Sequence, residues 1–326
     1  MTLSIKPLDP AGYLPHRTHT GERIWAESNC YVDLWTEVLH ANGFEPLACL
    51  PFTIGADLEG DQWTFFKFPL TDLYRLFGID VIELNIWRPL LDHVEEQLAL
   101  GRIPIVETDG WYLPDTRGTS YRSEHVKTSI AIQMLDRRGG RLGYFHNAGY
   151  FELSGEDFAG TFRLDADPDA PNLPLYVEVA KLNARSPLTG ADLVAASAHL
   201  LGEQLRRRPE VNPFHRYGRR FTDDLAWLSS QPLEVFHRYA FSGLRQCGAA
   251  FELAAIYLRW LGDNGYRGLS TAAVAFDEIS SAAKALQFKT ARYVNTRKPF
   301  DPDPTLDAMG GKWDAAMGVL MSRCSV

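Results

Sequence analysis

The stretch HVKTSIAIQMLDRRGGRLGYFH, residues 125–146, decides the fold. It contains a β-rich run from His125 to Leu135 and a second run from Arg141 to His146, and the turn residues 137–140 separate them. Such runs on either side of a glycine-containing turn are typical of an antiparallel hairpin. A further β-rich run, Ile103–Asp109, precedes the hairpin. We therefore expect a three-stranded sheet in this part of the chain.

Helical patterns flank the predicted sheet. Apolar residues recur at i, i+3, i+4, i+7 and i+8 from Tyr31 to Leu39, which predicts a helix over about 28–41 with Ser28 or Asn29 as its N-cap. From about Thr189 onward the pattern predicts further helices over 189–207, 221–229, 232–262, 270–290 and 304–322. The sequence thus predicts an α+β N-terminal half and an all-helical C-terminal half.

The proline-rich stretch 165–174 is the expected domain boundary, and a short strand, Leu175–Ala180, follows it. We predict a catalytic domain over residues 1–164, a linker with an accessory strand over 165–185, and a helical domain over 186–326.

Composition excludes several classes of protein. The 326 residues carry a formal net charge of −8, which resolves into −10 for residues 1–160 and +2 for residues 161–326. An acidic balance argues against nucleic acid as the main ligand. No apolar run is long enough to span a membrane, and the N-terminus lacks a signal-peptide pattern, so we expect a cytoplasmic protein. The four cysteines form no CxxC pair, and no metal site or bound cofactor is expected.

Cys30 is the most informative position because it lies in the first turn of the predicted helix. Unsatisfied N–H groups and the helix dipole favour a thiolate there. A nucleophilic thiol needs a base and a residue that orients the base. His125 starts a predicted strand, and Asn147 follows the next one, so the hairpin brings both to the same end. The order Cys, His, Asn is that of papain-like enzymes.

Other interpretations of these residues stay open. Cys30 is also compatible with a buried structural thiol, which is the commoner case for a cysteine. His125 is compatible with a surface strand residue, Asn147 with a turn former, and His146 with the role of the true partner.

Polar residues elsewhere are candidates for binding. Asn29 or Gln62 is expected to supply an oxyanion donor. The acidic turn that contains Asp57, Glu59 and Asp61 is either a solvated turn or a site for a cation or an amine, and Asp109 joins this substrate-binding set. A basic stretch is either solvated or binds an acidic partner or a phosphate; it comprises Arg206, Arg207, Arg208, Arg216, Arg219 and Arg220.

Several strings are distinctive when they are taken together: Glu27–Trp35, Asp57–Lys67, His125–Thr128 and Gly143–Gly149. With them, the chain resembles an uncharacterised bacterial family, domain of unknown function 1839, over most of its length. This resemblance implies a family and no function.

A more distant likeness suggests an activity. A cysteine-headed helix, a helix that ends in Gly-Arg-Ile-Pro before a strand, the run Asp109–Pro114 and a His-led strand are similar to the butirosin-biosynthesis acyltransferase family over roughly residues 25–160. That resemblance implies a papain-like fold and a role in secondary metabolism, with Cys30 as nucleophile, His125 as base and Asn147 as the orienting residue. The relatives often have Asp in the third place. They also have a glycine-rich strand where this chain has its acidic turn.

The leading hypothesis is an acyl or aminoacyl transferase. Cys30 would accept an acyl group from the phosphopantetheine thioester of an acyl carrier protein, or from a CoA thioester, and pass it to a small-molecule amine or second thiol. Two alternatives are a cysteine peptidase or amidohydrolase with the same triad, and a non-catalytic scaffold in a biosynthetic assembly.

Overall fold

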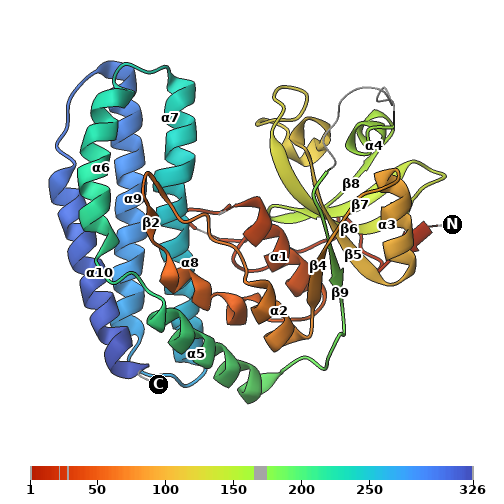
Figure 1. Ribbon diagram of the computed structural model, residues 1–326, viewed down its shortest axis with the longest axis horizontal. Helices are drawn as coiled ribbons and strands as arrows, with labels where there is room; N and C mark the ends of the chain where they lie inside the picture. Colours follow the sequence, from red (N-terminus) through yellow and green to blue (C-terminus); the bar gives the residue numbers. More distant parts are fainter. Residues whose placement is uncertain (1, 22, 28, 165–174, 325–326) are drawn as a thin grey trace. The chain divides into compact units, whose positions relative to one another are not determined.

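A computed structural model describes residues 2–21, 23–27, 29–164 and 175–324 (Figure 1). The chain is α+β, as predicted. It divides into two compact units that alternate along the sequence. The sheet unit comprises residues 1–21, 29–45 and 70–187, and the helical unit comprises residues 22–28, 46–69 and 188–326. The expected boundary at 165–174 lies outside the described residues.

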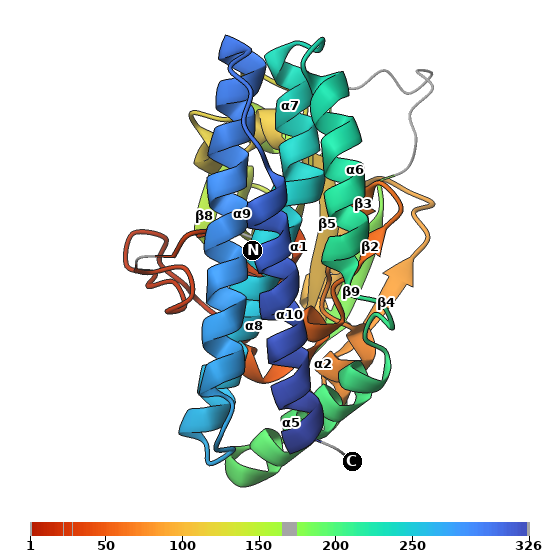
Figure 2. The ribbon, with the colours of Figure 1, turned by 90° about the vertical axis from the view of Figure 1, so that its left-hand side faces the viewer.

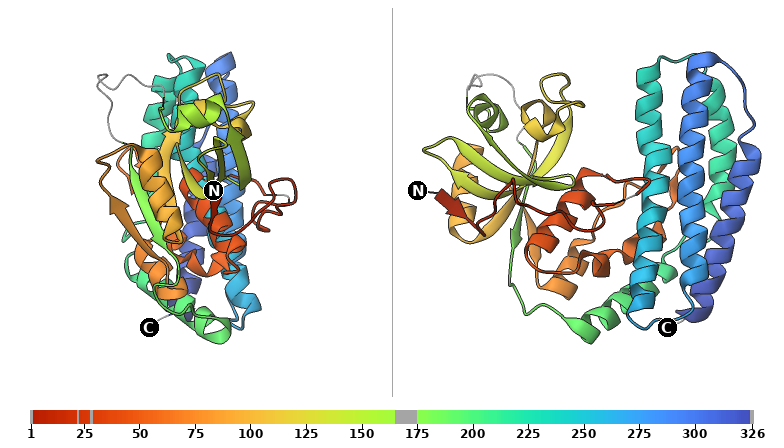
Figure 3. Two further views of the ribbon diagram at one scale, coloured as in Figure 1. Left: turned by 90° about the vertical axis from the view of Figure 1, so that its right-hand side faces the viewer. Right: turned by 180° about the vertical axis from the view of Figure 1, so that it is seen from behind.

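The sheet unit is built around seven antiparallel strands. They are β1 (Thr2–Ser4), β4 (Asp80–Leu84), β5 (Arg102–Asp109), β6 (Lys127–Asp136), β7 (Arg141–His146), β8 (Gly149–Ser154) and β9 (Val177–Lys181). The order is β4-β9-β5-β6-β7-β8, and β1 pairs with the far end of β6. The sheet is strongly twisted (Figure 3). The predicted β6–β7 hairpin, β5 and the strand after 174 are confirmed, whereas β1 and β8 were not expected.

The two faces of the sheet carry different layers. Val106 and Ile130 share one face, where they pack with Leu91 and Val94 of α3 (Leu90–Ala99). On the opposite face lies α1 (Cys30–Ala41), which contacts β6, β7 and β8. Two short helices complete the unit, α2 (Leu70–Phe77) and α4 (Glu156–Thr161).

The predicted first helix is confirmed, and its start is fixed by a side-chain cap. The Asn29 side-chain oxygen accepts a hydrogen bond from the Val32 N–H at 2.9 Å. An N-cap of this kind satisfies one of the N–H groups that a helix start leaves without an intrahelical partner. Cys30 is therefore the first residue of α1.

The helical unit contains α5 to α10, of which α6, α7, α9 and α10 run side by side (Figure 2). Their bounds are α5 (Gly190–Arg206), α6 (Pro213–Leu228), α7 (Leu233–Ala240), α8 (Gln246–Asp263), α9 (Ser270–Thr296) and α10 (Asp303–Arg323). The helix expected over 221–229 begins earlier because Asn212 caps it and Pro213 occupies its first position. The helix expected over 232–262 is interrupted by a π-helical turn, Phe241–Arg245.

Two segments of the N-terminal half belong to the helical unit. Residues 46–69 form two 3-10 helices, Pro46–Cys49 and Pro51–Gly55, and the two-residue strands β2 (Leu58–Glu59) and β3 (Gln62–Trp63). The Trp63 ring is buried against the aromatic rings of Phe214, Tyr217 and Phe251.

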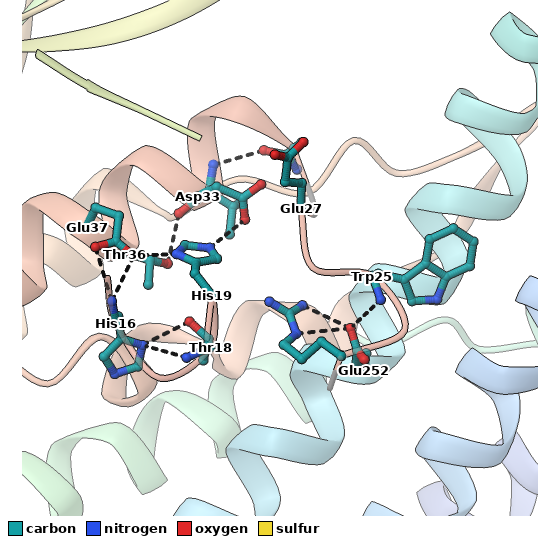
Figure 4. Close-up of polar contacts among 12 residues, drawn as sticks. His16, Thr18, His19, Trp25, Glu27, Asp33, Thr36, Glu37 and Glu252 are labelled. Carbon is teal, nitrogen blue, oxygen red and sulfur yellow. Dashed lines mark hydrogen bonds and ion pairs between the residues drawn. The ribbon is translucent and has the colours of Figure 1, made fainter. Parts of the chain in front are cut away.

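The other segment, residues 23–27, is anchored on α8 by Glu252. Its carboxylate accepts hydrogen bonds from the Arg23 guanidinium at 3.0 Å and from the N–H groups of Ile24 and Trp25 at 2.7 and 3.1 Å (Figure 4). The Trp25 ring packs so closely on Gly248 that a Cβ there would lie 2.3 Å from it. No helix in the described part of the chain has the length and apolarity needed to cross a membrane.

Candidate active site

Asp109 and His125 form a hydrogen-bonded pair where β5 ends and β6 is about to begin. The His125 Nδ1 lies 2.6 Å from Asp109 Oδ2. The second carboxylate oxygen accepts the Trp111 N–H at 3.0 Å, and the Trp111 ring stacks on the imidazole at 4.6 Å and 11°. Because a carboxylate only accepts, Nδ1 carries a proton and the neutral ring presents Nε2 as a base.

Gly110 explains why the chain can make this arrangement. Its N–H donates to the Val126 carbonyl at 2.8 Å, directly beside His125 in sequence. A Cβ at this position would lie 2.7 Å from the Ser120 hydroxyl, so a larger residue would push the loop away. The close approach places Asp109 at the Nδ1 edge of the imidazole and Trp111 against one of its faces.

A cavity of about 350 Å³ lies beside the imidazole. Lys127 Nζ is 2.6 Å from Glu107 Oε1 on this wall, and the His125 side chain is 69% exposed. The cavity therefore offers charges of both signs together with an accessible base. It is lined by Glu107, Thr108, Asp109, His125, Val126, Lys127, Arg163, Leu175 and Tyr176.

The strand register puts the start of α1 on the same face of the sheet as Asp109. Directly paired residues, and alternate residues along a strand, share a face. Ile105 is two positions from Glu107 and four from Asp109, so these three residues of β5 share a face. Ile105 pairs with Glu178 of β9, which therefore lies on the same face. Tyr31, the residue after Cys30, donates its hydroxyl to Glu178 at 2.7 Å.

Glu178 also connects α1 with the cavity. Its other carboxylate oxygen accepts the hydroxyl of Tyr176, a cavity residue, at 2.9 Å. Burial and the Glu178 carboxylate raise the pKa of the Tyr31 phenol, which keeps it a neutral hydrogen-bond donor. The Cys30 side chain is half-buried at this end of the helix.

Two family models match the chain over most of its length. The DUF1839 N-terminal domain matches residues 14–182, and the DUF1839 C-terminal domain matches residues 190–322. The chain belongs to the DUF1839 family. No curated protein matches it.

In this DUF1839 protein His125 Nδ1 hydrogen bonds to Asp109, whereas the sequence had suggested Asn147 as the partner of the imidazole. Asn147 occupies the two-residue turn between β7 and β8, where His146 pairs with Gly149, and its φ of 45° suits that turn. This placement agrees with the alternative interpretation of Asn147 as a turn former.

His146 does not partner His125. Its Nδ1 lies 2.5 Å from Asp115 Oδ2, its Nε2 lies 2.7 Å from the Thr128 hydroxyl, and its side chain is 2% exposed. With both ring nitrogens engaged inside the sheet unit, this histidine holds the loop that contains Asp115 against β6 and β7.

The remaining predicted binding residues of the DUF1839 chain are divided between the units. The side-chain oxygen of Asn29 serves as the cap of α1. Gln62, Asp57, Glu59 and Asp61 belong to the helical unit, where Asp57 forms an ion pair with Arg216.

The basic stretch is only partly available to a partner. Arg216 is held by Asp57 and by the Leu58 carbonyl, and Arg220 pairs with Asp224 at 2.7 Å. Arg208 donates to the Leu205 carbonyl at 2.8 Å. Three of the six arginines are exposed, two at the C-terminal end of α5 and one on α6: Arg206, Arg207 and Arg219. A groove of about 690 Å³ in the same unit is lined in part by Asp61, Gln62 and Arg220.

Among residues 2–21, 23–27, 29–164 and 175–324, no group of three or more His, Cys, Asp or Glu side chains is arranged to hold a metal ion. The sequence did not lead us to expect that the Trp111 ring stacks on the His125 imidazole. The signal was the Asp-Gly-Trp run directly after a strand, because an Asp-Gly dipeptide marks a turn.

Proposed function

We propose that this DUF1839 protein is an acyltransferase in which Cys30 is the nucleophile, His125 the general base and Asp109 the residue that orients the base. The observation that supports it best is the Asp109–His125 pair beside a cavity, on the sheet face where α1 begins. A base held by a carboxylate and a thiol at a helix start are the components that thiol acyl transfer needs. The resemblance to papain-like acyltransferases, which often have Asp in the third place, points the same way.

The chemistry proceeds in two halves. His125 Nε2 takes the proton of the Cys30 thiol, and the resulting thiolate attacks the carbonyl carbon of a thioester. The donor sulfur then leaves and takes that proton from His125. An amine then attacks the acyl-cysteine and gives a proton back to His125 as the Cys30 sulfur leaves. Attacking and leaving thiols are matched in the first half, so little driving force is lost.

The donor we propose is the thioester of a carrier-protein phosphopantetheine arm or of CoA, in the cytoplasm, where such donors are made. The exposed Arg206, Arg207 and Arg219 are the cations that we expect to meet its acidic groups. The acidic residues of the cavity suit an amine acceptor.

Hydrolysis is a second candidate, because the 69% exposure of the His125 side chain admits water to the base. Consumption of the donor without an amine present would favour hydrolysis, and consumption that depends on the amine favours transfer.

The decisive test is an acyl-enzyme adduct. The protein is incubated with acetyl-CoA or p-nitrophenyl acetate as probe donors, and the acylated peptide is located by mass spectrometry. We expect the adduct on Cys30, its loss in Cys30→Ala, and its retention in Cys324→Ala, which removes the other half-buried thiol. An adduct that survives Cys30→Ala overturns the assignment.

A further inference from the structure

A buried histidine lies between two carboxylates of the helix that carries Cys30. His19 Nε2 is 3.2 Å from Asp33 Oδ1, and its Nδ1 hydrogen bonds to Glu37 Oε1 (Figure 4). The three side chains are 2% exposed or less. They belong to the sheet unit, where the loop containing His19 folds onto α1.

With Asp33 and Glu37 ionised, the geometry makes His19 an imidazolium. Both ring nitrogens face carboxylate oxygens, and a carboxylate can only accept, so both nitrogens must carry protons. Burial lowers the pKa of His19, but hydrogen bonds and the charges of Asp33 and Glu37 outweigh it and raise the pKa to about 9. The Glu37 carboxylate also accepts the Tyr13 hydroxyl at 2.5 Å and the His16 N–H at 3.0 Å.

This cluster lies on the Cys30 side of the helix. Cys30, Asp33 and Glu37 are spaced at i, i+3 and i+7, which puts them on one face of α1. Side chains three residues apart on a helix have Cβ atoms about 5–6 Å apart. The buried carboxylates of Asp33 and Glu37 would disfavour a negative charge on the Cys30 sulfur, and the His19 imidazolium cancels one of their two charges.

We propose that His19 is a positioning residue for Cys30: its positive charge offsets Asp33 and Glu37, and its two hydrogen bonds fix the first two turns of α1. The proposal rests on the proposed role of Cys30 as nucleophile. On this proposal the loop that contains His19 contributes to the reactivity of the Cys30 thiol at the start of α1.

The test measures how fast iodoacetamide alkylates Cys30 in the full-length protein. The rate is followed by peptide mass spectrometry from about pH 6 to 10, because alkylation reports the thiolate. His19→Gln is expected to slow Cys30 alkylation at pH 7 by about three- to tenfold and to displace the pH–rate profile to higher pH.

His16→Gln is the matched control. His16 is buried in the same loop and hydrogen bonds to Thr18 at 2.9 Å. Burial and the neighbouring His40 lower its pKa to about 4, so its replacement removes packing but no charge at pH 7. The control is expected to keep the wild-type rate.

Glu37→Gln gives a readout of opposite sign. Removing one carboxylate while His19 stays protonated brings the cluster to neutrality, so Cys30 should react about threefold faster. The pH–rate profile of Cys30 should also move to lower pH, a displacement that mere exposure of the half-buried thiol by damage to the fold would not produce.

The outcomes separate the two claims. If Cys30 in the wild type reacts no faster than Cys324, the proposed function and this inference both fall. If wild-type Cys30 is fast but His19→Gln matches His16→Gln, or Glu37→Gln is slower, only the role of His19 is overturned.

Discussion

Replacing Asp109 with Asn should separate catalysis from stability. The Asp109 carboxylate accepts the His125 Nδ1–H at 2.6 Å and so leaves Nε2 free to take a proton. An Asn amide can instead donate to Nδ1, which moves the ring proton to Nε2 and removes the base. Loss of an oriented general base costs about 10²- to 10⁴-fold in rate, or about 3–5 kcal/mol at about 1.4 kcal/mol per tenfold.

The stability of Asp109→Asn should change little. The His125 side chain is 69% exposed and that of Asp109 is 34% exposed, so solvent screens the pair. Exposed pairs of this kind contribute at most about 1 kcal/mol. At about 2–4 °C per kcal/mol for a unit of this size, the melting temperature should fall by no more than a few degrees.

The assay is the pre-steady-state release of p-nitrophenol from p-nitrophenyl acetate, with and without an amine acceptor, alongside thermal melting. Asn147→Gly is the control, because a turn residue with a φ of 45° tolerates glycine. We expect the control to keep its rate. The assignment of Asp109 is refuted if Asp109→Asn keeps its rate within about threefold, or if Asn147→Gly loses as much.

Three further predictions concern stability. The pKa of His19 is about 9 in the folded protein and about 6.5 in the unfolded chain, so its contribution to stability is complete below pH 6.5 and is lost as the pH rises through 9. The melting temperature should therefore fall between pH 7 and 9.5, and it should fall less in His19→Gln; an equal fall in both proteins would contradict this. Glu252→Gln replaces the buried carboxylate opposite the Arg23 guanidinium and should cost about 3–5 kcal/mol in urea unfolding, whereas a loss below about 1 kcal/mol would show that the anchor is dispensable. Gly248→Ala should destabilise by about 1–3 kcal/mol or more, since its Cβ would lie 2.3 Å from the Trp25 ring; a melting temperature equal to that of the wild type would contradict this packing.

Local signals in the sequence were sufficient for much of the sheet unit. The 3.6-residue period and an Asn cap place α1 within two residues of its start, and the glycine-containing turn places the β6–β7 hairpin. Cys30 at the helix start follows from the same cap. These features depend on neighbours within a few residues, which a sequence shows directly.

The partner of His125 depended on information that the sequence does not show. Asp109 meets His125 because Asp109 pairs with Lys127 across β5 and β6, and a shift of the register by one residue would turn the carboxylate to the other face. Asn147 was favoured because it shares a hairpin with His125, but the two-residue turn before β8 was not anticipated. The His19 cluster was missed for a similar reason, since a loop histidine has no periodicity that points to α1.

The alternation of the two units along the chain bears on how α1 is held. Residues 29–45, which contain α1, belong to the sheet unit, while the segments on either side, 22–28 and 46–69, belong to the helical unit. The first flanking segment is fixed by Glu252, and the second is fixed by the buried Trp63 and by the ion pair between Asp57 and Arg216. The chain therefore enters and leaves the sheet unit around α1 through segments whose own contacts lie on helices after residue 188. A cut near 165–174 would strip both segments of the partners that bury them, so we expect a fragment that ends there to be less stable to urea than the full chain.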